Sequence, residues 1–215
     1  FYGSISAKGG TQSGDGGFIE TSSRNQLEAT GSASASATNG VPGEWLIDPN
    51  NIEISGATGT NITGMSNFTS TDDGAIIQNI TIQTQLNTGT DVTVTTASAG
   101  GNGEFGNIVI NADITKNSGA EASLSLSAHN DIVLKADKTI TSNSNPLNLA
   151  MIADKDNSGT GGIVIESDVT INTLGGDVEM QASDGIFMDT GASIQTGGGD
   201  IDMVNNVAFD GTNFV

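Results

Sequence analysis

The feature that most constrains this chain is a succession of very short, alternating apolar segments. Each is bounded by Gly, Asn, Asp or Ser, and the set comprises Val92-Thr93-Val94, Ile108-Val109-Ile110, Leu124-Ser125-Leu126, Ile132-Val133-Leu134, Leu147-Asn148-Leu149, Ile163-Val164-Ile165, Val178-Glu179-Met180 and Ile201-Asp202-Met203. Apolar residues at alternate positions, with β-branched side chains between turn residues, indicate strands. Because helical periodicity is missing almost everywhere, the pattern predicts an all-β chain.

These segments repeat at a long and nearly constant spacing. Residues 106–115 resemble residues 161–170 at an offset of 55 positions. Four further pairs are offset by 54 positions: Leu124 and Val178, Ile132 and Ile186, Ile140 and Ile194, and Leu147 and Ile201. A sustained period indicates a repeat architecture, and helical repeats or propeller blades do not fit short strands with few aromatic residues.

A β-solenoid is the repeat architecture that remains. In such a stack each coil contacts only its neighbours. We expect Ile, Val, Leu and Met to point inward, Ser, Thr, Asn and Asp to point outward, and Gly and Asn to take left-handed conformations at corners. At roughly 20 to 27 residues per coil, the chain would form about eight to ten coils.

The chain is predicted to be a single β-helix segment, 1–215, of a larger exoprotein. Within it we expect first coils over 1–54, an irregular loop excursion over 55–85, and repetitive coils over 86–215. The last region divides into the internal repeats 106–160 and 161–215. The excursion is predicted because Gly-, Ser-, Thr- and Asp-rich stretches interrupt the strand rhythm there.

Composition excludes several functional classes. With six Lys and Arg against 25 Asp and Glu, the formal net charge of −19 disfavours binding to nucleic acids or anionic membrane surfaces. Cysteine is absent and His129 is the single histidine, so thiolate and multi-histidine metal centres are not available. No apolar stretch reaches the length of a membrane span, so membrane insertion is not expected.

Calcium is the one cation for which the sequence offers candidate ligands. Asp154, Asp156 and Ser158 occupy the first, third and fifth positions of an oxygen-ligand loop, with Gly159 sixth. The twelfth position, where a bidentate Glu closes such loops, holds Ile165. The favoured interpretation is therefore an Asx-type turn between coils, and calcium is the alternative.

Other motifs are weaker indications of a functional site. Asn61, Asn67 and Asn79 each begin an Asn-X-Thr sequon and are possible glycosylation sites. We interpret His129 as a turn residue, because its counterpart 54 positions later is Ser183. The acidic pairs Asp72-Asp73 and Asp200 with Asp202 could serve a glycosidase or lyase, but basic residues are scattered. No catalytic residue and no cofactor are predicted.

Two segments resemble a known protein family. Gly14-Asp15-Gly16-Gly17-Phe18-Ile19-Glu20 and Gly43-Glu44-Trp45-Leu46-Ile47-Asp48-Pro49 are similar to segments of two-partner-secretion exoproteins, the filamentous-haemagglutinin-like and high-molecular-weight adhesins of Gram-negative bacteria. Residues 86–96 and 106–203 resemble the following segment and the stacked repeats of that family. The resemblance implies a right-handed parallel β-helix, export through an outer-membrane partner barrel, and a surface adhesin or effector stalk.

The combined expectation is a structural and adhesive segment of a large secreted or surface-exposed bacterial adhesin, and not an enzyme. Extended Thr-, Asn- and Ser-rich faces would bind a receptor or glycan on host or neighbouring bacterial cells. Two alternatives stay open: a polysaccharide-active β-helix enzyme and the stalk of a contact-dependent toxin.

Overall fold

The computed structural model describes residues 4–20, 32–43, 45–46, 51–57, 62–63, 67–70, 75–96 and 105–205. The elements before residue 90 are β1 (Ser4–Ser6), β2 (Ile19–Glu20), β3 (Ser32–Ser34), β4 (Trp45–Leu46), β5 (Ile52–Ser55), β6 (Ile62–Thr63), β7 (Asn67–Ser70), β8 (Ala75–Gln78) and α1 (Asn79–Leu86). The strands after residue 90 are β9 (Val92–Thr95), β10 (Ile108–Ile110), β11 (Ile114–Lys116), β12 (Ala122–Ser127), β13 (Ile132–Leu134), β14 (Thr139–Ser142), β15 (Leu147–Ile152), β16 (Gly162–Ile165), β17 (Thr170–Asn172), β18 (Val178–Ala182), β19 (Gly185–Met188), β20 (Ser193–Gln195) and β21 (Ile201–Asn205).

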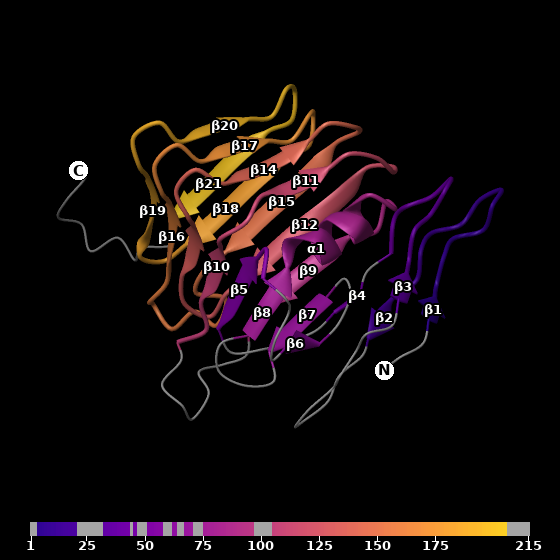
Figure 1. The fold of residues 1–215 in the computed structure, drawn as a ribbon, viewed down its shortest axis with the longest axis horizontal. Coiled ribbons are helices and arrows are strands. Elements are labelled where there is room, and N and C mark those ends of the chain that lie inside the picture. Colours follow the sequence, from indigo (N-terminus) through magenta and orange to yellow (C-terminus); the bar gives the residue numbers. More distant parts are fainter. Residues whose placement is uncertain are drawn as a thin grey trace.

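The strands stack as coils of a parallel β-helix, a β-solenoid of about 5 turns (Figure 1). The sheets are a six-stranded sheet (β19-β16-β13-β10-β5-β8), a four-stranded sheet (β11-β14-β17-β20) and a seven-stranded sheet (β21-β18-β15-β12-β9-β7-β6), to which successive coils contribute one strand each from β9 onward. The predicted β-solenoid is confirmed, but eight to ten coils was too high an estimate. The main stack has fewer coils than the chain length alone predicts, because strands β1 to β4 pair in a separate stack and residues 79–86 form a helix.

Coil length varies along the inward columns. In the six-stranded sheet Ile108 pairs with Ile132, Ile132 with Ile163, and Ile163 with Ile186. The steps between these residues are 24, 31 and 23 positions, so an offset of 54 or 55 spans one short and one long coil. In the seven-stranded sheet the column partner of Ile201 is Val178, which itself pairs with Leu149. Leu147 is therefore not the counterpart of Ile201.

The inward columns form one continuous hydrophobic core from β5 to β18. Its side chains are almost all aliphatic, and Ile108, Ile132 and Ile163 are completely buried. Because similar residues stack on one another in register, each side chain is shielded from water by the coils on both sides. This arrangement suits a chain with 35% hydrophobic but only 4% aromatic residues, since no wide interior has to be filled.

Asparagine and aspartate side chains join successive coils at the corners. Before the six-stranded sheet, the N–H of Asn107 donates to Oδ1 of Asn51 at 2.7 Å, and the N–H of Asp131 donates to Oδ1 of Asn107 at 3.0 Å. The N–H of Gly162 continues the ladder by donating to Oδ1 of Asp131 at 2.9 Å. These bonds satisfy backbone groups where the chain leaves the strand ladder.

Within the excursion predicted over residues 55–85, the described residues include regular elements. Strand β8 pairs in parallel with β5, and α1 then passes beside β11 at the end of the four-stranded sheet (Figure 1). Ile82 and Leu86 are completely buried, which places one helical face against the core. The helix forms despite two β-branched isoleucines and two threonines because tertiary burial outweighs local propensity.

The strand order explains why the rhythm changes here. Strand β5 lies between β8 and β10 in the six-stranded sheet, so this part of the chain does not wind in sequence order. In the seven-stranded sheet β6 pairs antiparallel with β7, the single antiparallel pairing among the described strands. The segment therefore closes this end of the main stack while contributing strands to two of its sheets.

The segment before residue 47 forms a thinner stack. β1 pairs in parallel with β3, and β2 with β4. Its separate core consists of Ile19 and Ala35, with Ile5 and Ala7 packed against them. A Cβ added at Gly16 would collide with the carbonyl oxygen of Ala35, so glycine allows the two coils to approach this closely.

The outer surface differs from expectation on one sheet. By strand alternation, the six-stranded sheet turns Val109, Val133, Val164 and Phe187 outward, and these four residues pair in one register column. The β-solenoid pattern predicts polar residues on the outside. The signal was present, because the runs Ile108–Ile110, Ile132–Leu134 and Gly162–Ile165 have uninterrupted apolar residues, which is typical of strands with two apolar faces.

Candidate functional site

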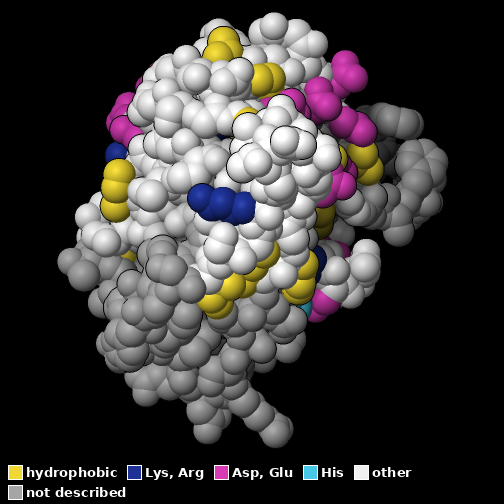
Figure 2. All heavy atoms as spheres, turned by 90° about the vertical axis from the view of Figure 1, so that its right-hand side faces the viewer, with side chains coloured by type: hydrophobic (Ala, Val, Ile, Leu, Met, Phe, Trp, Pro, Cys, Tyr) yellow, Lys and Arg dark blue, Asp and Glu magenta, His cyan; other side chains and the backbone are white. Residues whose placement is uncertain are grey.

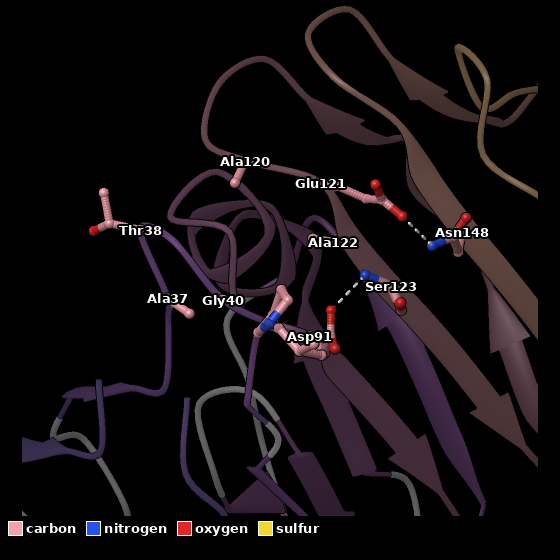
Figure 3. A pocket seen from close by; sticks show the side chains of 11 residues that line it. Ala37, Thr38, Gly40, Asp91, Ala120, Glu121, Ala122, Ser123 and Asn148 are labelled. Atoms are coloured by element: carbon pink, nitrogen blue, oxygen red, sulfur yellow. Dashed lines mark hydrogen bonds between the residues drawn. The ribbon is translucent and has the colours of Figure 1, made fainter. Parts of the chain in front are cut away.

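A groove of about 380 Å³ lies between the thin amino-terminal stack and the main stack (Figure 3). Residues of the 37–42 segment form one wall, and residues at the beginnings of β9, β12 and β15 form the other. The lining residues are Ala37, Thr38, Gly40, Val41, Pro42, Asp91, Ala120, Glu121, Ala122, Ser123 and Asn148. Sequence reasoning missed this groove because its two walls are far apart along the chain.

Hydrogen bonds between coils fix the polar wall of the groove. Oδ1 of Asp91 accepts from the N–H of Ser123 at 2.7 Å, and Oε1 of Glu121 accepts from Nδ2 of Asn148 at 2.9 Å (Figure 3). Oδ1 of Asn148 accepts in turn from the N–H of Asp177 at 3.0 Å. The described lining residues include no Lys, Arg or His, and they offer hydrogen-bond acceptors and hydroxyls.

The four-stranded sheet carries a second candidate surface on its outer face. One register column consists of Thr115, Thr141, Asn172 and Gln195, and the adjacent column contains Thr139, Thr170 and Ser193. None of these seven side chains is buried. We call this set the polar ladder. It places neutral donors and acceptors at the spacing of the coils, about 4.8 Å.

The calcium candidates lie together in the loop that lengthens one coil. Oδ1 of Asp154 accepts from the N–H of Ser158 at 2.7 Å and from its Oγ at 2.8 Å, while Oδ2 accepts from the N–H of Gly159 at 3.1 Å and from Oγ of Ser183. The carboxylate of Asp156 accepts from the same N–H of Ser158 at 3.3 Å. These contacts form the Asx-type turn, and the calcium alternative stays a prediction.

These contacts determine the direction in which the pKa of Asp154 is shifted. Burial would raise the pKa of this carboxyl, but hydrogen bonds from Ser183, Ser158 and the N–H of Gly159 outweigh burial and hold its pKa below the ordinary value. Among the described residues, no three side chains of His, Asp or Glu are grouped so that they could hold a metal ion.

His129 lies beside Thr96 at the corner after the seven-stranded sheet. Its N–H donates to Oγ1 of Thr96 at 2.8 Å, and its Nδ1 lies 3.2 Å from the same oxygen. Thr96 is completely buried and donates to the carbonyl of Gly106 at 3.0 Å. Ser183 contacts Asp154, so these contacts do not assemble a serine–histidine–aspartate relay, in which the histidine would bridge the other two.

The remaining sequence candidates are placed only in part. Asn79 begins α1, and its Nδ2 donates to the carbonyl of Asp113 at 2.7 Å, a bond that attachment of a glycan would disturb. Asn67 begins β7, while its side chain, together with Asn61, Asp72 and Asp73, lies outside the described residues. Asp202 pairs in register with Glu179 on the outer face of the seven-stranded sheet.

Lys116 is a buried cation that no sequence motif indicates. It is completely buried at the end of β11, and its Nζ donates to the carbonyl of Ser144 at 2.5 Å. Burial lowers the pKa of this ammonium, and the charge of Glu121 partly opposes the shift. Its register partner Ser142 is buried and polar, and so are Thr173 and Thr196, which directly follow β17 and β20 of the same sheet.

The described surface on the face shown in Figure 2 is mostly neutral. In the space-filling view, acidic side chains gather in a few places, hydrophobic side chains form small separate groups, and most of the described surface is neither (Figure 2). Within the described part of the chain, no helix is long and apolar enough to cross a membrane.

The chain matches no protein-family model, and the search of curated proteins finds no match.

Proposed function

We propose that the chain is a structural and adhesive segment of a large secreted or surface-exposed bacterial protein, in which the β-solenoid displays binding faces. The polar ladder carries this proposal. Its hydroxyl and amide groups recur in register over four coils, from Thr115 and Thr141 to Asn172 and Gln195. Such a face offers many weak hydrogen bonds in one repeating direction, which suits an extended ligand with repeating hydroxyls.

Charge narrows the class of ligand. The ladder residues are uncharged, while the whole chain carries a formal net charge of −19. Anionic polysaccharides would be repelled, whereas neutral glycans on a host or neighbouring cell would not. Together with the resemblance of the Trp45 segment to exported adhesins, this supports cell-surface glycans as partners and export through an outer-membrane partner barrel.

The proposal is tested with beads that carry the chain and with labelled dextran, mannan and hyaluronan as probes. We expect retention of at least one neutral polysaccharide and none of the anionic hyaluronan. Replacing Thr141 and Thr170 by Val keeps their shape but removes two ladder hydroxyls, and should weaken retention several-fold. Ser125→Ala, on the outer face of the seven-stranded sheet, is the matched control.

Two results would contradict the proposal. Retention of hyaluronan alone would exclude a neutral glycan ligand, and equal retention by wild type and by the Thr→Val variant would exclude the polar ladder. Release of new reducing ends during incubation would instead favour the polysaccharide-active enzyme.

A further inference from the structure

The outer face of the six-stranded sheet bears an apolar column that the polar ladder does not explain. Val109, Val133, Val164 and Phe187 follow one another in register over four consecutive coils. We call these four residues the apolar column. The three valines are half-buried, and Phe187 at its end is 56% exposed. Parallel strands with two apolar faces are ordinarily covered on both, most often by helices.

The spacing of residues along the apolar column indicates whether a helix or a strand would fit over it. Coils succeed one another every ~4.8 Å. The apolar positions of an amphipathic helix advance by about 5.4 Å per turn, so a helix laid along the solenoid axis stays in step over four coils. Side chains on one face of an extended strand recur every ~6.7 Å and lose step after the second coil. A helix is therefore the better match.

The charges beside the column indicate which charge the partner helix should carry on either side of its apolar face. Glu53 pairs with Val109 at one end of the column. Asp131, Glu166 and Asp189 directly flank β13, β16 and β19, each two positions from a column residue and therefore on the same face by strand alternation. Lys135 is the one cation among the described residues of this face, and it pairs with Glu166. Because carboxylates predominate and the chain carries a net charge of −19, a second copy would be repelled and a basic partner attracted.

We propose that the apolar column is a docking site for a cationic amphipathic helix of a partner protein. The helix lies along the solenoid axis, with its apolar side chains between the valines and its Lys or Arg residues beside Glu53, Asp131 and Asp189. This mode of recognition, an apolar helix face against an apolar surface with complementary charges at the rim, is independent of the glycan proposal, which concerns the four-stranded sheet.

The test uses a labelled Leu/Lys peptide of about 18 residues with leucines at helical i, i+3, i+4 and i+7 spacing. A peptide of the same composition with alternating Leu and Lys is the pattern control. We expect the helical peptide to bind in fluorescence anisotropy, to gain helical circular dichroism on binding, and to bind at least tenfold more tightly than the alternating peptide.

Two matched variants separate the apolar contact from general attraction of a basic peptide. Val133→Asp and Thr141→Asp each add one negative charge at an outward position, the first in the apolar column and the second in the polar ladder. If general attraction between the basic peptide and the acidic chain were the only interaction, both variants would bind the peptide as tightly as wild type or more tightly. We expect at least tenfold weaker binding for Val133→Asp and wild-type binding for Thr141→Asp. If Val133→Asp does not fold, the near-isosteric Val133→Thr replaces it, with a smaller loss expected.

Three outcomes overturn the proposal. They are equal binding of both peptides, equal binding by both variants, and concentration-dependent dimerisation of the wild type in sedimentation that Val133→Asp abolishes. The last result would assign the apolar column to a second copy of the chain.

Discussion

At the scale of single residues, the corners of the coils contain hydrogen bonds and backbone conformations that sequence patterns indicate only weakly. Buried polar side chains there accept or donate hydrogen bonds between coils, and several residues have left-handed backbone conformations. Asn and Asp tolerate such conformations, but Leu174 has φ of 51° as well. The corner residues therefore contribute unequally to stability, and three substitutions measure this.

Replacing Leu174 by Gly should stabilise the protein. Leu174 is 45% exposed, and the equivalent residue one coil later is Gly197, with φ of 70°. Relief of the left-handed strain should exceed the greater chain entropy of glycine and raise the free energy of unfolding by about 1 kcal/mol. Leu174→Ala keeps the Cβ and should bring no gain in thermal denaturation. A gain with Ala equal to that with Gly would assign the effect to the exposed side chain instead.

Replacing Lys116 by Met should also stabilise the protein. Burial of the ammonium opposes folding at neutral pH, whereas Met fills a similar volume without charge. The carbonyl of Ser144, which Nζ would no longer contact, lies 3.3 Å from Oγ of Ser142, whose shorter bond is to the carbonyl of Asn145 at 2.6 Å. We expect a gain of about 1–2 kcal/mol in urea denaturation. Because the pKa of Lys116 is lower in the folded state, wild-type stability should rise as the pH increases toward the ordinary lysine pKa. A flat wild-type profile there would contradict the assignment.

Asp154 should make stability fall in acid. Its pKa is lower in the folded than in the unfolded chain, so its contribution is present above about pH 4 and is lost as the pH falls through the folded value. Asp154→Asn should therefore lower the melting temperature at pH 7, and the difference from wild type should shrink by pH 2. Asp156→Asn in the same loop is the control. Parallel curves for wild type and Asp154→Asn would show that this carboxylate does not titrate with folding.

At the scale of elements, strand alternation decides which side chains enter the core. On β16, Ile163 is completely buried while Val164 lies on the opposite face. The same alternation brings the polar ladder to the outside of the four-stranded sheet. Helix α1 departs from the pattern, yet its buried Ile82 and Leu86 continue the same core.

A charge on the two faces of β16 should have very different effects. Ile163→Asp places a carboxylate between Ile132 and Ile186 in the core, and should cost several kcal/mol or prevent folding. Val164→Asp places the same charge on the outer face and should cost about 1 kcal/mol. Both are measured by chemical denaturation. Equal losses would mean that the inward and outward assignments of this strand are wrong.

At the scale of the whole molecule, the chain consists of two stacks of unequal thickness. The main stack buries a continuous aliphatic core, and the amino-terminal stack has a small core of Ile19 and Ala35. The groove lies between them, lined from both sides (Figure 3). Stability in a stacked protein is close to a sum over coils and their interfaces, so these two parts need not open together.

Hydrogen exchange should distinguish the two stacks. The N–H groups of Ala7 and Gly43 bond to neighbouring coils of the thin stack, and the N–H of Ile108 bonds to Asp131 in the main stack. We expect the first two to exchange at least tenfold faster than the third in mass-spectrometric peptide mapping, because less apolar surface must be exposed to open them. Equal protection would indicate a single cooperative unit.

The sequence by itself determined the β-solenoid, because in-register stacking requires short strands, turn residues and inward aliphatic side chains at a repeating spacing, and these are local properties. It also indicated the Asx-type turn at Asp154. Tertiary structure alone decided the insertion of β5 between β8 and β10, the helix α1, and the groove beside Asp91. These features depend on contacts between distant segments, whose burial outweighs local propensity. The apolar column depends on both the sequence and the tertiary structure. Its uninterrupted apolar runs can be recognised in the sequence, but only the sheet aligns them in one register column.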